Sequence, residues 1–343
     1  MKKIMRWVVR ILNWCVMAGL ILGYLSPYIN PNTLGFIGFF GLTFQAWAVA
    51  GIILVIVSSL LRIPKWYHLA IALVPLLFYA KRIYGFGSTP ASASVDLRVV
   101  SFNVRGFGAM ENTSKSIDSF LLAHRADVAV LIEYRRPQNK MKHKEMPHAA
   151  KFMHGVNAGI KVVSRFPIIR SERIELPETE GDAGYADIRL NNDTIRVYAL
   201  HLESNKLTPT DYHEMKGLEL DSSYQERVRD VYDRLLFGMK KQSEQALIVK
   251  KHMASSPYPV MLCADLNATP MSFSYQTLKG SMLDAFSMTG SGIGSTYLKP
   301  FEVLRIDYIL YDRFFTCQLY GDYDGIFSDH KLIFASFSYT PKN

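Results

Sequence analysis

The sequence has no acidic residue before Asp96, although its 343 residues include 30 acidic and 39 basic side chains. Eight of the basic residues lie in that first stretch, which leaves 31 basic against 30 acidic residues in the remainder. The net charge of +9 therefore belongs almost wholly to the N-terminal region. It is no evidence for a basic nucleic-acid groove, because basic residues flanking apolar segments are instead typical of membrane proteins.

Cysteine is also scarce, which excludes two classes of small stabilised domain. Cys15, Cys263 and Cys317 are too few and too far apart for a disulfide framework or a zinc site. Cys263 lies in an apolar strand pattern, so we interpret it as a small core residue. The glycines of 290–294 do not precede a helix in a βαβ unit, which argues against a nucleotide-cradling loop.

Residues 1–84 are expected to form a membrane anchor of three transmembrane helices. Apolar stretches run approximately over Ile11–Leu25, Leu34–Leu61 and Trp66–Ala80. A helix needs about 20 apolar residues to cross a bilayer core, and only the second stretch reaches that length without basic side chains extending to the interface. A cleaved signal peptide is the weaker interpretation of the first stretch, because no small-x-small cleavage site follows it.

The basic residues also predict which side of the membrane the rest of the chain occupies. With three spans, two basic residues, Lys81 and Arg82, lie on the far side of the membrane. The other six lie on the cytoplasmic side: Lys2, Lys3, Arg6, Arg10, Arg62 and Lys65. The positive-inside rule places everything after residue 83 on the periplasmic or extracellular side of an inner or plasma membrane. If the third stretch is only interfacial, that part returns to the cytoplasm. Residues 85–95, rich in small side chains, are expected to be a linker.

Residues 96–343 are predicted to alternate strands with helices, and several strands end in a polar residue. Asn103, Glu133 and His201 each end an apolar, β-branched run. A carboxylate such as that of Glu133 is costly at the end of a buried strand unless it lies at the rim or is paired. The long segment 205–256 has the pattern of an amphipathic helix or helix pair, and packing on the sheet is favoured over contact with a membrane surface.

The stretch Val260–Pro270 is the most informative of these strand ends. An apolar strand runs directly into Asp265 and Asn267, and side chains two apart in a strand share a face. A carboxylate beside an amide could hold a metal, a phosphoryl oxygen or a water there. Taken alone, such a stretch is more often a strand ending in a capped turn.

Three further polar residues complete the set, Asp307 within a strand pattern and Asp329 with His330 just before the last strand. Active sites of α/β folds assemble where strand ends converge, so we expect these side chains to gather with those at the other strand ends. Four acids, two amides and two imidazoles suit an oxygen-ligated hard cation with a water-activating histidine. Zinc would prefer more histidine or cysteine ligands.

The motifs of this region also resemble a known family. SFNV, VLIE, AGIKVVSRFPI, LHLES, CADLNATP, RIDYIL and SDH occur, between Leu97 and about Tyr339, in the order found in the endonuclease/exonuclease/phosphatase superfamily. The resemblance implies an α/β fold, a four-layer sandwich of two packed mixed β-sheets flanked by helices. It also implies a phosphoric ester hydrolase that depends on Mg²⁺ or Mn²⁺. Ala264 departs from the glycine that usually precedes the Asp-x-Asn motif.

The resemblance assigns a role to each strand-end residue. Glu133 would be the principal metal ligand, and Asn103 and Asp329 would lie in the metal and phosphate shell. His330 would activate or orient the attacking water, and Asp307 would hold its imidazole in the right tautomer. Asp265 and Asn267 would position the nucleophile and stabilise the transition state. His201 would donate to a phosphoryl oxygen or the leaving group.

Three functional hypotheses follow for the substrate and partners. The first is a membrane-anchored phosphodiesterase, held in the membrane through residues 1–84, that acts by in-line attack of water on a lipid headgroup or another surface substrate. The second is a periplasmic or extracellular nuclease, which the absence of a basic excess in residues 96–343 disfavours, because duplex binding relies on neutralising phosphates. The third is an inactive binding module, which the intact acids and histidines disfavour. A small-molecule phosphoester remains open as substrate, and no obligate protein partner is evident.

Overall fold

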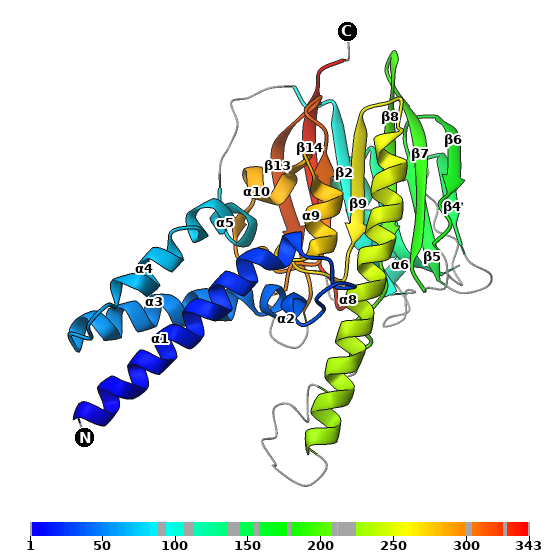
Figure 1. Cartoon of the computed structure of the whole chain (residues 1–343). Coiled ribbons are helices and arrows are strands. Elements are labelled where there is room, and N and C mark those ends of the chain that lie inside the picture. The colour runs from blue at the N-terminus through cyan, green and yellow to red at the C-terminus, as the bar shows by residue number, and fades with distance from the viewer. Residues whose placement is uncertain are drawn as a thin grey trace.

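The computed structural model describes residues 2–87, 94–105, 113–135, 145–153, 158–176, 180–207, 211, 224–298, 304–324 and 328–341, and side chains within 113–135 from residue 117 onward. Its larger part contains two six-stranded sheets (Figure 1). The first has the order β13 (Phe315–Tyr323), β14 (Leu332–Tyr339), β2 (Leu97–Asn103), β3 (Val128–Tyr134), β5 (Gly159–Ser164), β4 (His148–Phe152). The second has the order β10 (Leu283–Asp284), β12 (Asp307–Tyr311), β9 (Val260–Asp265), β8 (Asp193–His201), β7 (Asp182–Leu190), β6 (Ile168–Arg173).

Both sheets are mixed, and they pack face to face. β2 runs parallel to β3, and β8 runs parallel to β9, whereas the neighbouring pairs are antiparallel. The core between the sheets takes alternate side chains from each strand, such as Val130 in the first sheet and Val197 and Met261 in the second. The central strands are buried on both faces, which explains why they read as continuous apolar runs.

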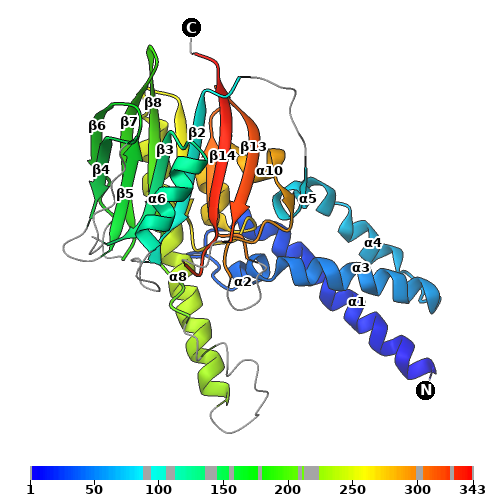
Figure 2. The same cartoon turned by 180° about the vertical axis from the view of Figure 1, so that it is seen from behind.

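Helices cover the outer face of each sheet (Figures 1 and 2). On the first sheet, α6 (Thr113–Ala123) packs Ile117 and Phe120 into a second core cluster. On the second sheet lie α8 (Tyr224–Ala254) and α9 (Phe273–Lys279), and α8 contributes residues including Val249 to a third cluster. The four layers of helix, sheet, sheet and helix confirm the predicted fold class, and α8 is one continuous helix whose C-terminal half packs on the sheet.

The N-terminal residues form a separate group of helices: α1 (Lys2–Leu25), the 3₁₀ turn η1 (Ser26–Tyr28), α2 (Ile37–Leu42), α3 (Phe44–Leu60), α4 (Tyr67–Leu73) and α5 (Leu76–Ile83). The second and third apolar stretches are therefore not continuous helices. The second is interrupted at Thr43, whose hydroxyl donates to the Phe39 carbonyl, and the third is interrupted just before Pro75. Among the described residues, one helical segment, Lys2–Tyr28, is long and apolar enough to cross a membrane.

Small residues allow α1 and α3 to pack closely. Gly19 and Gly23 are four residues apart on one face of α1, and a Cβ at Gly19 would overlap the ring of Trp47. A Cβ at Gly51 of α3 would similarly crowd Leu73 of α4 and Leu20 of α1. Such small-xxx-small faces let helix backbones approach each other closely.

Two contacts fix the end of this helical group to the sheets. β1 (Gly85–Phe86) pairs with β11 (Ser291–Gly292), so the first residues of the expected linker form a strand; residues 88–93 of that linker lie outside the described part. The buried Arg305 donates to the Arg82 carbonyl at 2.9 Å and forms an ion pair with Asp284 at 2.8 Å, next to α10 (Ala285–Thr289).

We expect Arg305→Ala to lower the free energy of unfolding by about 3–5 kcal/mol, because it leaves the buried Asp284 carboxylate without its counter-ion. The exposed Arg189→Ala is the matched control and should stay within about 0.5 kcal/mol. Denaturant unfolding of the full chain in detergent micelles measures both changes. Similar losses in the two variants would contradict the importance of the buried ion pair.

Candidate functional site

Strand register brings three of the predicted residues to adjacent positions on the second sheet. His201, at the end of β8, lies opposite Asp265, at the end of β9, in a parallel pair. On the other side of β9, Asp307 lies opposite Asp265 in the antiparallel pair with β12. Two acids and an imidazole from three adjacent strands thus lie side by side at the same end of the sheet.

The first sheet contributes Asn103 and Glu133 from the ends of β2 and β3. The pairing of β3 with β5 shifts register between Leu131 and Tyr134, and Glu133 has the left-handed φ of +52°. That conformation costs a residue with a Cβ about 1–2 kcal/mol. Bulges of this kind redirect a side chain, and here the Glu133 side chain reaches the strand ends of the second sheet that carry His201 and Asp265.

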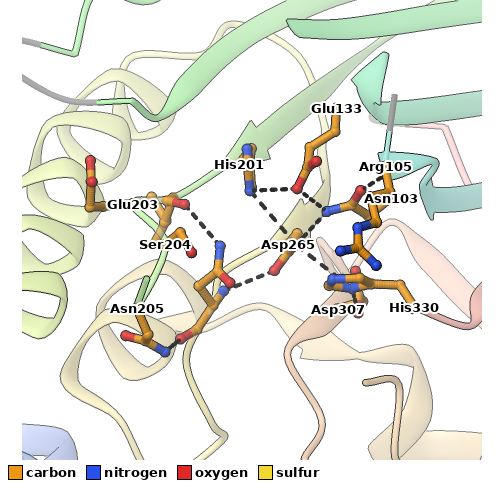
Figure 3. A network of polar contacts seen from close by, with 12 residues as sticks. Asn103, Arg105, Glu133, His201, Glu203, Ser204, Asn205, Asp265, Asp307 and His330 are labelled. Atoms are coloured by element: carbon orange, nitrogen blue, oxygen red, sulfur yellow. Dashed lines mark hydrogen bonds and ion pairs between the residues drawn. The ribbon is translucent and has the colours of Figure 1, made fainter. Parts of the chain in front are cut away.

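The amide of Asn103 joins the two sheets at the site (Figure 3). Its Nδ2 donates to Glu133 Oε1 at 2.9 Å and to Asp265 Oδ2 at 2.9 Å, and its oxygen accepts the backbone N–H of Arg105. His201 Nε2 lies 3.6 Å from Glu133 Oε1 and 3.8 Å from Asp265 Oδ2. The Asn103 amide therefore bridges the two carboxylates, and the His201 ring lies beside both.

His330 and Asp307 form a buried pair beside this cluster. His330 Nδ1 is 3.0 Å from Asp307 Oδ2 and 3.7 Å from Asp265 Oδ2. Burial acts to lower the pKa of His330, but the negative charges of Asp307 and Asp265 outweigh it, and the pKa lies above its ordinary value. Burial raises the pKa of Asp307, against the opposing attraction of His330. The pair therefore holds a proton between the imidazole and the carboxylate.

Asn267 corrects one inference from the strand pattern. The strand ends at Asp265, and Asn267 follows in a left-handed conformation with φ +48°. Its backbone N–H donates to Asp265 Oδ1, and its side-chain Nδ2 donates to the Leu202 carbonyl. The expectation that the two side chains share a strand face is wrong, because the chain turns between them.

Asp329 lies at the rim and is held by a residue that the sequence analysis did not select. Arg105 Nη1 makes an ion pair with Asp329 Oδ2 at 2.9 Å, and about half of the Arg105 side chain is exposed. Arg105 stands two residues after Asn103 and has a left-handed φ of +43°. Its position directly after the end of a strand is the feature of the sequence that could have identified Arg105 as a site residue.

The loops after β8 and β9 are braced by α8, through residues that sequence patterns could not identify. Gln242 Nε2 donates to the carbonyls of Glu203 and Asn267, and Asn205 Nδ2 also donates to the Asn267 carbonyl. Gln245 accepts the backbone N–H of Glu203. Amides on a helix face resemble ordinary solvated residues in a sequence, so only the fold shows that they position the site.

The donor set fits an oxygen-ligated divalent cation. The carboxylates of Glu133 and Asp265 are gathered around one amide, and such oxygens suit Mg²⁺ or Mn²⁺. Within the described residues, Asp265, Asp307 and His330 also offer ligand atoms that lie within 4.8 Å of one another. In that second group the His330 nitrogen already bonds to Asp307, so Glu133 is the better candidate for the principal ligand.

Comparisons with known proteins agree with this architecture. One solved structure with a similar fold is D. rerio TDP2 complexed with a single-strand DNA product, which is 16% identical over 71% of this chain and 98% of that chain, with a TM-score of 0.54. A second is an endonuclease/exonuclease/phosphatase from Bacteroides vulgatus, which is 15% identical over 72% of this chain and 100% of that chain, with a TM-score of 0.55. A third is the human Nocturnin catalytic domain with a bound sulfate anion, which is 16% identical over 71% of this chain and 94% of that chain, with a TM-score of 0.51. At these identities the likeness shows the fold alone. No curated protein matches the chain.

Two family models match, and they divide the chain much as the structure does. Residues 3–83 match a model described as Domain of unknown function (DUF8431). Residues 100–330 match the model of the Endonuclease/Exonuclease/phosphatase family, whose members are hydrolases acting on phosphoesters. That match covers more than half of the chain, so this protein belongs to the Endonuclease/Exonuclease/phosphatase family.

Proposed function

We propose that the chain is a membrane-anchored, divalent-metal-dependent phosphodiesterase whose substrate is a lipid headgroup or another phosphodiester held at the membrane surface. The observation that carries this proposal is the contact between the N-terminal helices and the site. Thr269, two residues after Asn267, donates from Oγ1 to the carbonyl of Gly41 in α2 at 3.3 Å. The apolar helices are therefore packed directly against the loop that bears a candidate catalytic residue.

Glu133, Asn103 and Asp329 are the residues proposed to hold Mg²⁺ or Mn²⁺. Glu133 would supply the principal ligand, Asn103 orients the Glu133 carboxylate, and Asp329 lies near the Arg105 guanidinium, which could contact a phosphoryl oxygen. When bound, the cation would neutralise charge developing on the phosphoryl group and favour the neutral form of nearby imidazoles.

His330 is proposed to take the proton from the attacking water. In the neutral form of the ring, with Nδ1 donating to Asp307, Nε2 is the atom that remains to accept a proton. Asp307 holds the ring in that tautomer and stabilises the imidazolium that forms, as carboxylates do in other acid–base pairs. The attack would then proceed in line with the scissile P–O bond.

The residues on the opposite side of the cluster are proposed to position the nucleophile and stabilise the transition state. Asp265 lies within 4 Å of both imidazoles, so its charge can orient the water and both rings. His201 would donate to a phosphoryl oxygen or to the leaving group. Asn267, held by α8 and by the Leu202 carbonyl, would fix the backbone of this loop against the substrate.

The placement of basic residues supports an extracytoplasmic catalytic domain. The N-terminal half of α1 and the junction between α3 and α4 lie together, since Arg10 and Lys65 line one pocket. This basic end is distant from the sheets in both views (Figures 1 and 2). We propose that it faces the cytoplasm and that residues 96–343 lie on the periplasmic or extracellular side. The number of spans remains a prediction.

We expect Glu133→Gln and His330→Ala each to lower phosphodiesterase activity at least about 10²-fold, because each removes a group proposed to act in the transition state. The full chain in lipid nanodiscs is assayed with Mg²⁺ or Mn²⁺ against phospholipids, sphingolipids, plasmid DNA and inositol phosphates. His148→Ala, which removes an imidazole on β4 away from the cluster, is the control and should retain activity.

The same assay separates the competing functions. Consumption of a lipid by the wild type but not by His330→Ala would support the proposal. Metal-dependent nicking of the plasmid alone would favour a nuclease, and activity unchanged in both variants would show that the site is assigned wrongly. Absence of turnover on every substrate, with metal binding retained, would favour a binding module.

We expect Mg²⁺ or Mn²⁺ to raise the thermal unfolding temperature of the wild type, because binding to the folded state adds about 2.7 kcal/mol at a hundredfold excess over the dissociation constant. Glu133→Gln should lose most of this shift, since it removes the principal ligand but preserves the side chain's shape. Thermal unfolding with and without the cation tests this independently of activity. An equal shift in both proteins would place the metal elsewhere.

A further inference from the structure

The N-terminal half of α8 projects past the ends of the strands. Both views show it leaving the sheets beside α2, at the end that carries the candidate site (Figures 1 and 2). Val228, Tyr232, Leu235 and Met239 follow one another at intervals of four, three and four residues, which places them in a single stripe along one face of the helix. A projecting helix with an apolar stripe needs a surface to cover it.

The part of the stripe closest to the sheets is covered by α2 and the loop before it. Gly35 and Gly38 have no room for a Cβ because Leu236 and Met239 lie against them. Beyond them, the ring of Phe39 stacks on Tyr232, with ring centroids 4.5 Å apart and an angle of 11° between the planes. The contact is therefore continuous from Met239 to Tyr232.

Polar contacts fix α8 to the same loop. Asn32 Nδ2 donates to Ser243 Oγ at 3.0 Å and to the Lys240 carbonyl at 3.3 Å. Ser243 Oγ donates in turn to Asn30 Oδ1 at 3.1 Å. The angle at which α8 leaves the N-terminal helices is thus held by hydrogen bonds as well as by packing.

Past this contact, the stripe stays exposed among the residues that the structure describes. Val228 is 49% exposed and Tyr232 is 38% exposed, and the loop before α2, which packs on α8 at Gly35, exposes Leu34 (45%) and Phe36 (47%). We name these four residues the α2–α8 face. Charged side chains occupy other sides of the projecting helix, including the ion pair of Arg229 with Asp233.

We propose that the α2–α8 face rests in the interfacial layer of the bilayer. The face is continuous with the N-terminal helices, whose apolar side chains, such as Ile56 and Leu60 of α3, are at least as exposed. Its tyrosine presents an apolar ring with a polar tip, which suits the headgroup region. The proposal rests on the membrane anchoring proposed above, but it does not depend on the reaction.

This placement gives α8 two tasks. One end of the helix meets lipid at Val228, and less than four turns away Gln242 holds the carbonyl of Asn267. The helix therefore sets the mouth of the site close to the headgroups. A phosphodiester carried by the membrane would reach the site without leaving the bilayer surface.

Spin labels on the full chain in phosphatidylcholine and phosphatidylglycerol vesicles test the proposal. Cys15 is exposed and is replaced by serine, whereas Cys263 and Cys317 are buried. A nitroxide on Val228→Cys should be more accessible to oxygen and less accessible to a water-soluble nickel chelate than one on Ile169→Cys, an exposed residue of β6. Equal accessibility at both positions, or protection of Val228→Cys from both reagents by a protein surface, would overturn it.

A charge substitution gives a functional measurement. Val228→Glu should raise the apparent KM for a phosphodiester presented in vesicles severalfold and leave kcat for a water-soluble phosphodiester unchanged, and Ile169→Glu should alter neither. An unchanged vesicle KM in Val228→Glu would count against the α2–α8 face. If the spin label lies in lipid and no phosphodiester is hydrolysed, the surface is confirmed and the proposed function alone fails.

Discussion

The geometry of the candidate site depends on one amide. Asn103 donates from a single nitrogen to Glu133 and Asp265, which belong to different sheets. The two sheets share a largely apolar core, and this polar contact, together with the hydrogen bond between His330 and Asp307, joins the strand ends that carry the site. Two carboxylates brought together in this way offer the oxygen ligands that a hard divalent cation prefers.

The sequence predicted the strands and the location of the site because both follow from periodicity, whereas the four layers were implied by the resemblance to the family. Buried runs ending in polar residues identify strands and the edge where Asn103, Glu133, His201 and Asp265 converge. Motif order then supplied the family, which the match to residues 100–330 confirms. These features depend on local pattern and strand order alone.

Other features depend on contacts between distant segments and could not be predicted. The turn that rotates Asn267 away from the strand face is stabilised by Leu202, and Asp329 is paired with Arg105 across the site. The interruption of the second apolar stretch at Thr43 likewise separates α2 from α3, and α2 then packs on α8. Hydropathy measures length and composition, so it shows neither the break nor the partner.

The contacts at Arg305 and at Thr269 attach the N-terminal helices to the sheets at two separate points. A body held at two points cannot pivot as one on a single flexible tether can. If the helices are fixed in a bilayer, the height and tilt of the site above that bilayer become constants of the molecule. Encounter with substrate would then be governed by diffusion in two dimensions, and turnover would follow the number of substrate molecules per unit of membrane area rather than their concentration in bulk solution.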